Sequence, residues 1–173
     1  MTFPDLRIVN RTEIHLFAQM TGGDGRGGND RATILARIRQ KHCRILIVDD
    51  EPLFRNSIEL RMRRYQAELD FAAAGNRAIE KATSAERPFD LILLDIRLQK
   101  LNGSGAAEPD GVDVYDTLLH KGVTTPILFM TAYVDDNVRE KVAARKKKLH
   151  RKESPALFEE IESILLHCRG GDA

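Results

Sequence analysis

Three short runs of apolar residues, each ended by a polar side chain, dominate the pattern of this chain. They lie at residues 44–48, 89–94 and 126–130 and are rich in Ile, Leu and Val. They show little of the regular polar alternation that marks a half-exposed strand. Continuous runs of this kind are typical of strands buried on both faces of a parallel sheet. The pattern therefore predicts three central strands of such a sheet.

Outside these runs, apolar residues recur at helical spacing, so that strands and helices alternate along the chain. This alternation indicates an α/β fold with crossover helices. Weaker strands are predicted at residues 68–73 and 149–151, the second only because its place between two helices requires one. Helices are predicted at residues 52–62, 76–85 (with Asn76 as cap) and 111–120, from Asp135 or Asp136 into a basic run, and after the Ser154-Pro155 pair.

The polar residues that end the three runs are the candidate functional residues. Asp49 and Asp50 follow the first run, Asp95 ends the second, and Thr131 ends the third. Ligands of open parallel sheets bind at the carboxyl ends of the strands, so we expect these side chains to meet at one edge. Three carboxylates held together would repel one another unless a hard cation binds, and Mg²⁺ prefers oxygen ligands of this kind.

Composition narrows the choice of function further. The formal net charge of the 173 residues is +1, which gives no overall field for binding nucleic acid. No apolar stretch approaches the roughly 20 residues that span a membrane, and the charged amino terminus does not resemble a signal peptide. We therefore expect a cytoplasmic protein that binds no membrane. Cys43 and Cys168 are too few for a disulfide framework and are interpreted as free thiols.

Residues 1–42 differ from the rest and are expected to form an N-terminal extension, with the principal domain at residues 43–173. Short strands at residues 7–9 and 14–18 precede a Gly-rich stretch at 21–30. That stretch lacks the Gly-Lys-Ser/Thr of a phosphate-binding loop, so a flexible linker is the favoured interpretation. Asp30 is expected to cap a short helix that runs to Gln40.

The chain from about Cys43 to Cys168 resembles the receiver domain of two-component response regulators. The resemblance rests on five positions that occur in the right order. They are the acidic pair in Ile47-Val48-Asp49-Asp50-Glu51-Pro52, the acceptor segment Leu93-Leu94-Asp95-Ile96-Arg97-Leu98, the hydroxyl segment Met130-Thr131-Ala132, Lys152 after the fifth strand, and Gly111 at the start of the third helix. The resemblance implies a flavodoxin-like, doubly wound sheet of five parallel strands.

The resemblance also implies a mechanism. A phosphohistidine of a sensor histidine kinase or a histidine phosphotransfer protein would donate its phosphoryl group to Asp95, with Thr131 and Lys152 as the other catalytic residues. Mg²⁺ would be held by Asp49, Asp50, Asp95 and the backbone carbonyl of Arg97. Such a protein assists its own phosphorylation and is not expected to be an enzyme in its own right.

Several positions depart from the family pattern. The spacing from Asp95 to Gly111 is longer than usual, and residues 99–108 are interpreted as a solvated insertion or as a lid or partner contact. Leu149 replaces the aromatic residue that swings inward on activation. Glu153 follows Lys152 where proline is usual, so a trans bond is expected there. The basic run at residues 145–148 is interpreted as a solvated face or as a docking surface for an acidic partner.

No output domain follows Cys168 in the sequence, so we expect a single-domain response regulator that binds no DNA directly and acts through an unknown downstream protein. A homodimer through the fourth-helix to fifth-helix face of the receiver is a further expectation. The alternative is a degenerate receiver that acts as a phosphorylation-independent interaction module. A phosphatase of the haloacid-dehalogenase type is disfavoured, because Asp95-Ile96-Arg97 lacks the second acid that its Asp-x-Asp motif needs.

Overall fold

A computed structural model of the protein describes residues 27–98 and 109–168, with side chains from residue 31 onward. The predicted strands at residues 7–9 and 14–18, the Gly-rich stretch before residue 27 and the insertion at 99–108 lie outside the described residues. The chain divides into two compact units, residues 1–32 and 33–173. The second unit contains every predicted functional residue.

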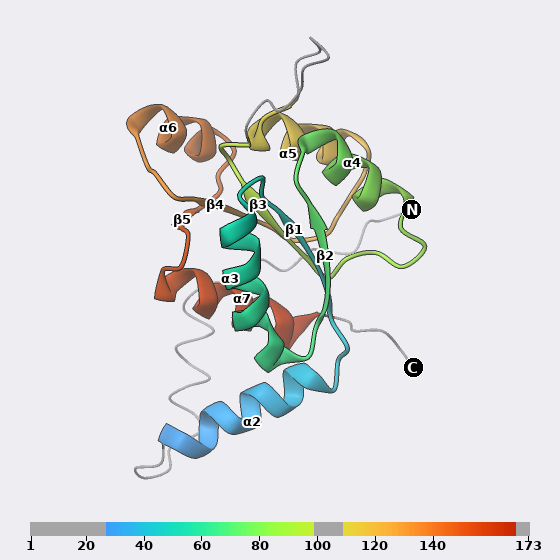
Figure 1. Cartoon of the computed structure of the whole chain (residues 1–173), viewed down its shortest axis with the longest axis vertical. Helices are drawn as coiled ribbons and strands as arrows, with labels where there is room; N and C mark the ends of the chain where they lie inside the picture. Colours follow the sequence, from blue (N-terminus) through green and yellow to red (C-terminus); the bar gives the residue numbers. More distant parts are fainter. Residues whose placement is uncertain (1–26, 99–108, 169–173) are drawn as a thin grey trace, which may run out of the picture. The chain divides into compact units, whose positions relative to one another are not determined.

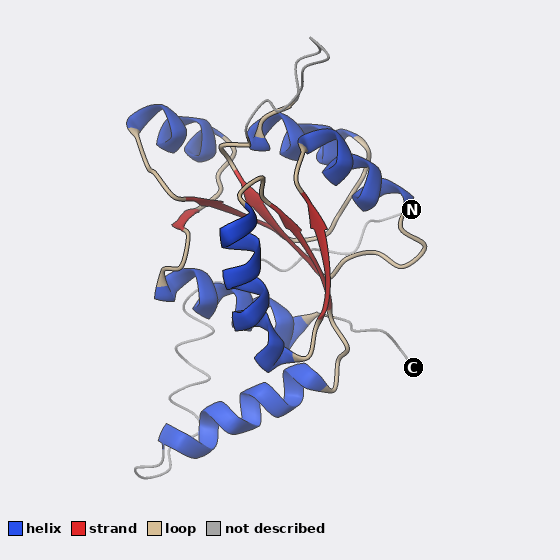
Figure 2. Ribbon diagram, in the orientation of Figure 1, coloured by secondary structure: helices blue, strands red, loops and turns tan. Residues whose placement is uncertain are grey.

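Five parallel strands form one sheet in the order β2-β1-β3-β4-β5, which confirms the predicted doubly wound α/β fold. Figures 1 and 2 show helices on both sides of this sheet. The elements are α2 (Gly27–Arg39), β1 (Arg44–Val48), α3 (Pro52–Met62), the 3₁₀ turn η1 (Arg63–Tyr65), β2 (Glu68–Ala72), α4 (Gly75–Ser84), β3 (Leu91–Asp95), α5 (Gly111–His120), β4 (Ile127–Thr131), α6 (Asp136–Ala144), β5 (Leu149–Arg151) and α7 (Pro155–His167).

The apolar runs fill two cores, one on each face of the sheet. In β1, Leu46 and Val48 face the core beneath α4, α5 and α6, whereas Ile45 and Ile47 face the core beneath α3 and α7. All four side chains are fully buried. Successive residues of a strand point to opposite faces, so only an apolar run without alternation satisfies both cores.

Helix starts follow capping chemistry only in part. Asp110, Asp135 and Ser154 accept backbone N–H bonds at the starts of α5, α6 and α7, the last as predicted. The prediction that Asn76 caps a helix is wrong, because α4 begins at Gly75 and its N-cap is Ala74. Similarly, α2 begins at Gly27, so Asp30 lies inside the helix.

The strand order places the ends of β1, β3 and β4 at neighbouring positions. Val48 is paired with Leu94, and Asp95 is paired with Met130. The residues that follow these strands therefore gather at one edge. Within the part of the chain that the structure describes, no helix has the length and apolar character needed to cross a bilayer.

Candidate functional site

Asp49 and Asp95 are held in the same way at the ends of adjacent strands. The Oδ1 atom of Asp49 accepts the backbone N–H of Glu51 at 2.9 Å, and Oδ1 of Asp95 accepts that of Arg97 at 3.0 Å. An acidic side chain that bonds the backbone two residues ahead stabilises the turn that leaves the strand. Each carboxylate is thereby fixed in orientation, and its Oδ2 atom is directed toward the same cation.

That cation is Lys152, which follows β5. Its Nζ atom lies 2.6 Å from Oδ2 of Asp49 and 2.8 Å from Oδ2 of Asp95. Burial opposes the charge on Lys152, but the hydrogen bonds to the two carboxylates outweigh burial and raise the pKa of this ammonium. Lys152 is therefore a permanent cation that joins Asp49, after the first strand, to Asp95 at the end of the third.

The acidic cluster has the charge and the ligand type that suit a divalent cation. Carboxylate oxygens of Asp49, Asp50 and Asp95 all lie within 4.8 Å of one another. Burial raises the pKa of Asp49 to about 6, with the neighbouring Asp95 adding to the shift against the favourable bonds from Lys152 and the backbone. Three carboxylates against one ammonium leave an excess of negative charge in a buried place, and oxygen ligands fit Mg²⁺. The Arg97 carbonyl as a fourth ligand stays a prediction.

Thr131 lies at the end of β4 and is fully buried. Its hydroxyl donates a hydrogen bond of 3.0 Å to the backbone carbonyl of Tyr133, two residues ahead. Lys152 adjoins this residue through the sheet, because its backbone N–H bonds the Thr131 carbonyl at 2.9 Å. The structure therefore brings Asp49, Asp50, Asp95 and Lys152 together, with Thr131 next to Lys152 in the sheet.

Gly111 shows why the start of α5 tolerates no side chain. A Cβ atom at this position would lie 2.1 Å from the backbone oxygen of Asp95 and 2.7 Å from the Cα atom of Ile96. The Gly111 N–H instead bonds the Ile96 carbonyl at 3.1 Å. The start of α5 therefore packs directly against the backbone of Asp95 and Ile96, which only glycine permits.

Comparison with known proteins identifies the family to which this fold belongs. A family model of the response regulator receiver domain matches residues 45–147, which is more than half of the chain. The chain belongs to this family. The similarity to receivers extends to individual proteins and to solved structures.

Among relatives, the two-component response regulator ARR22 of Arabidopsis thaliana is 27% identical over 141 residues, covering 82% of this chain and 93% of ARR22. The alkaline phosphatase synthesis regulator SphR of Synechococcus elongatus is 33% identical over 108 residues, covering 58% of this chain. The match spans only 38% of SphR, and two other matched response regulators, PilR and PhoP, are likewise covered by less than half of their length.

Solved structures show the same fold. The response regulator TrrA of Thermotoga maritima, solved in complex with Mg²⁺ and beryllofluoride, is 26% identical, with a TM-score of 0.57 over 70% of this chain and 98% of that chain. The N-terminal domain of a three-domain response regulator from Carboxydothermus hydrogenoformans is 28% identical, with a TM-score of 0.57 over 70% of this chain and 93% of that chain.

The rim of the receiver site carries a link that sequence reasoning missed. The Arg97 guanidinium is ion-paired with Asp135, the N-cap of α6, and lies 5.3 Å from the ring centre of Tyr133. Hydrogen bonds to the Val138 N–H, and then the Arg97 charge, hold the pKa of Asp135 below its usual range. The link joins the loop after Asp95 to the loop after Thr131. Nothing in the sequence signals a pair 38 residues apart.

Arg55 is a second residue that sequence reasoning missed. Its guanidinium donates a 2.6 Å hydrogen bond to the backbone carbonyl of Asp49. This bond attaches helix α3 to the acidic pair. The sequence signalled only Pro52, which starts the helix. An Arg on an amphipathic helix has no distinguishing pattern, so the bond could be found only in the structure.

The basic run at residues 145–148 is not a uniform face. Arg145 makes a two-pronged ion pair with Asp116 of α5, and Lys148 pairs with Glu160 of α7 at 3.2 Å. Lys147 lies 5.8 Å from the ring centre of Tyr115. Within residues 27–98 and 109–168, Lys146 is the member of this run for which no partner is found. Part of the run therefore joins helices and only part is available for docking.

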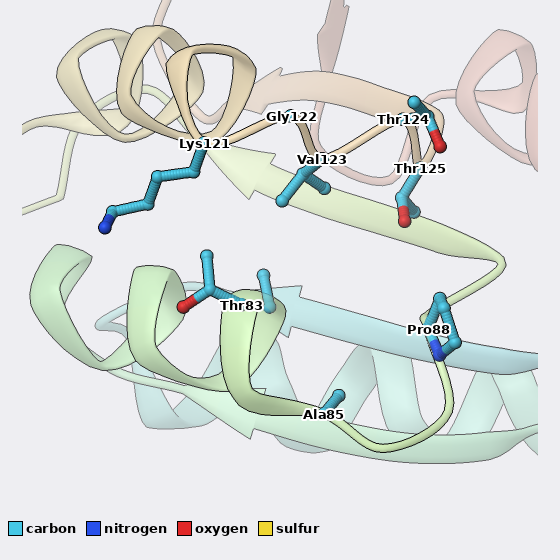
Figure 3. A pocket seen from close by; sticks show the side chains of 9 residues that line it. Thr83, Ala85, Pro88, Lys121, Gly122, Val123, Thr124 and Thr125 are labelled. Atoms are coloured by element: carbon cyan, nitrogen blue, oxygen red, sulfur yellow. The ribbon is translucent and has the colours of Figure 1, made fainter.

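Two hollows lie outside the acidic cluster. One of about 510 Å³ lies beside the Thr131 loop, and it is lined by Tyr133, Val134, Arg139, Leu149 and Arg151. The other, of about 440 Å³, is shown in Figure 3 between the carboxyl ends of α4 and α5. The lining of the second hollow contains one ionisable side chain, Lys121, and no carboxylate. It therefore offers no chemistry of the kind found at the strand ends.

Proposed function

We propose that this receiver accepts a phosphoryl group on Asp95 and relays the signal through protein contacts. The observation that carries the proposal is the position of Asp95, whose carboxylate is almost fully buried and held 2.8 Å from the Lys152 ammonium. A carboxylate oriented in this way is a nucleophile for phosphorus, and positioning with charge neutralisation supplies most of the catalysis of phosphoryl transfer.

In the proposed reaction an oxygen of Asp95 attacks the phosphorus of a phosphohistidine. The P–N bond breaks as the P–O bond forms, so that the imidazole leaves with the electron pair and Asp95 becomes an acyl phosphate. Lys152 remains protonated throughout and pairs with an oxygen of the transferring group. A Mg²⁺ ion bound by Asp49, Asp50 and Asp95, when present, supplies the remaining neutralisation of the phosphoryl charge.

Thr131 supports a switch in the same proposal. In this structure its hydroxyl bonds the carbonyl of Tyr133. A phosphoryl oxygen on Asp95 is a charged acceptor, and hydrogen bonds to charged acceptors are stronger than those to neutral carbonyls. The Thr131 hydroxyl would therefore exchange its acceptor and release the Tyr133 carbonyl, which alters the loop that leads into α6.

The proposed partners follow from this chemistry. The donor is a sensor histidine kinase or a histidine phosphotransfer protein, and the output is contact with a downstream protein in the cytoplasm. The match to 93% of the length of ARR22 supports a response regulator that works as a single domain. Leu149 lies partly buried beside the hollow at the Thr131 loop, so the loop itself and α6 would carry the signal.

Beryllofluoride, a mimic of the acyl phosphate, tests this proposal. Fluorine NMR of the full chain should show a bound signal only when Mg²⁺ is added, and Asp95→Asn should lose it while keeping the same far-UV circular dichroism. Lys148→Ala is the matched control, since Lys148 is paired on the surface away from the cluster. A folded chain that binds no beryllofluoride in Mg²⁺ would instead support the phosphorylation-independent interaction module.

A further inference from the structure

Two cysteines that are distant in sequence meet at the opposite end of the sheet from Asp95. Cys43 directly precedes β1, and Cys168 directly follows α7. Cys43 is buried, whereas Cys168 is partly exposed. The acidic cluster follows the carboxyl ends of the strands, so this pair lies at the amino-terminal edge and has no part in the proposed phosphoryl transfer.

The two cysteine sulfurs lie near the same backbone carbonyl oxygen, that of Leu165. Cys168 Sγ lies 3.2 Å from the backbone carbonyl oxygen of Leu165, and Cys43 Sγ lies 3.8 Å from the same atom. The two sulfur atoms and a carboxylate oxygen of Asp90 all lie within 4.8 Å of one another. A disulfide holds its sulfurs about 2 Å apart, so rotation about the side-chain bonds of the two cysteines must close the remaining gap.

The charges around the pair favour thiol chemistry over metal binding. The Lys41 ammonium donates a 2.6 Å hydrogen bond to the Cys168 carbonyl, and Arg87 pairs with Asp90 at 3.6 Å. Asp90 also accepts the backbone N–H of Arg44 at 2.8 Å. A divalent cation at this place would lie next to the positive side chains of Lys41 and Arg87. It would also compete for the Asp90 carboxylate, which already bonds Arg87 and the backbone of Arg44.

We propose that Cys43 and Cys168 form a reversible disulfide on exposure to a hydroperoxide. The more accessible Cys168 thiolate attacks the O–O bond of hydrogen peroxide and forms a sulfenic acid, and the thiol proton leaves with the displaced oxygen as water. The Cys43 sulfur then attacks the sulfenic sulfur, so that the S–S bond forms, the S–O bond breaks and a second water leaves. Two thiols are oxidised and one peroxide is reduced.

Burial explains the order of these steps. It raises the pKa of the Cys43 thiol, with Cys168 and Asp90 adding to the shift and Lys41 opposing it. Cys43 is therefore a poor target for peroxide and acts only after Cys168 has been oxidised beside it. The bond would close a loop that contains all five strands and would fasten α7 to the start of β1. Long closed loops restrict the unfolded chain most, so oxidation should raise Tm by roughly 10 °C.

Peptide mapping of the full chain tests the proposal. After peroxide treatment and trypsin digestion without reductant, the short peptide at residues 42–44 should be found joined to residues 153–169, at a mass lower by two hydrogens than the sum. Dithiothreitol should separate the two peptides and reverse the rise in Tm. Sulfinic acid on Cys168 with Cys43 still a thiol, dimers joined through Cys168, or stoichiometric Zn²⁺ held by both thiols would each overturn the proposal.

Variants separate the disulfide from other effects of peroxide. Cys168→Ser, at a partly exposed position, should fold normally and show no rise in Tm after peroxide. Cys43→Ser should behave likewise, and mapping of the unaltered chain decides the question if burial of the new hydroxyl prevents folding. Mg²⁺-dependent beryllofluoride binding should be the same before and after oxidation, because the pair and Asp95 lie at opposite edges. Loss of that binding would show damage at the acidic cluster and contradict a disulfide whose effects are confined to the amino-terminal edge of the sheet.

Discussion

Lys152 and Asp95 form an ion pair of 2.8 Å in which neither side chain is more than a tenth exposed. The same ammonium bonds Asp49 at 2.6 Å, so that one cation from the end of the sheet orients acids on two other strands. Such pairs make little contribution to stability when exposed, but a buried pair fixes geometry and charge where water cannot substitute. The pair is therefore the feature whose removal should most directly affect phosphorylation.

Lys152→Ala should lower the rate of phosphorylation by acetyl phosphate by roughly 100-fold, the usual effect of losing one preorganised donor at a developing negative charge. Incorporation of radiolabelled phosphate at saturating Mg²⁺ measures the rate. Lys148→Ala, which removes a surface lysine paired with Glu160, should leave the rate unchanged. An undiminished rate in Lys152→Ala would remove this residue from the mechanism.

The link between Arg97, Tyr133 and Asp135 predicts a long-lived acyl phosphate. Arg97 follows Asp95 by two residues, and its guanidinium is ion-paired with Asp135 at the start of α6 and lies 5.3 Å from the ring centre of Tyr133. If Asp95 is the acceptor, these two bulky side chains flank the path by which water would reach the phosphorus. Replacing Arg97 and Tyr133 together by Ala should speed loss of the phosphoryl group roughly tenfold, because water then reaches the phosphorus in the correct line. The half-life of the labelled protein after removal of the donor gives the rate.

The control for this shielding is Arg139→Ala, which removes an exposed arginine that lines the hollow beyond the Thr131 loop. It should leave the half-life unaltered. A half-life of seconds in the unaltered chain, with no further change in the double variant, would contradict shielding by these side chains.

Gly111→Ala should both destabilise the fold and impair phosphorylation. The new Cβ atom would lie 2.1 Å from the Asp95 carbonyl, so the acceptor backbone must move. Overpacking of this kind costs roughly 3 kcal/mol. Gly122→Ala is the matched control, because Gly122 has a positive φ of 77° but open space around it. The control should cost about 1 kcal/mol and leave phosphorylation intact. Urea unfolding and radiolabel incorporation measure the two effects.

The strand ends could be predicted from the sequence because apolar runs without alternation require burial on both faces. Val48 and Leu94 are adjacent in the sheet, which is why Asp49 and Asp95 meet. The side-chain links around the site could not be predicted in this way. The pairs Arg97–Asp135 and Arg145–Asp116 depend on which loop lies beside which helix, and surface residues with the same composition fit many partners.

Helix starts show the same division. Ser154 and Pro155 were predicted correctly because both satisfy or remove free N–H groups in the first turn. Asn76 has equally good capping chemistry but lies inside α4. The N-cap is Ala74, two residues earlier, and Gly75 packs under the start of α5, where a Cβ atom would lie 2.5 Å from the Pro109 carbonyl and 2.8 Å from the Val114 side chain. Tertiary packing therefore overrides local capping preference at this point.

His150 predicts a pH dependence of stability. It is buried in β5, and burial lowers its pKa below 6.5, with Lys148 adding to the shift and the Glu160 carboxylate opposing it. The unfolded chain therefore binds a proton at this residue near pH 6.5 while the folded chain does not. The stability that this histidine contributes is complete above pH 6.5 and is lost as the pH falls toward the folded-state pKa.

The difference in the free energy of unfolding between the unaltered chain and His150→Gln isolates this effect, because all other groups titrate in both proteins. Urea unfolding at a series of pH values gives the difference. It should shrink as the pH falls below 6.5. Parallel curves for the two proteins would show that His150 gains its proton equally in the folded and unfolded states.

The basic run predicts a salt-sensitive contact with an acidic partner, but through only part of its length. Arg145 and Lys148 are engaged with Asp116 and Glu160, so reversing their charge would disturb the packing of α5 and α7. Lys146 and Lys147 are exposed and make no ion pair within residues 27–98 and 109–168. These two residues are therefore the ones to change when docking is to be separated from folding.

Lys146→Glu with Lys147→Glu should abolish capture of an acidic partner by the beryllofluoride-bound chain in a pull-down, while radiolabelling of Asp95 continues at the original rate. Exposed charges are screened over about 10 Å at 0.1 M ionic strength, so added salt should weaken capture by the unaltered chain. Lys121→Glu, at the carboxyl end of α5 and outside the basic run, is the control and should bind normally. Capture that survives both charge reversal and high salt would mean that the basic run has only a structural role, at the end of α6 and in its ion pairs to α5 and α7.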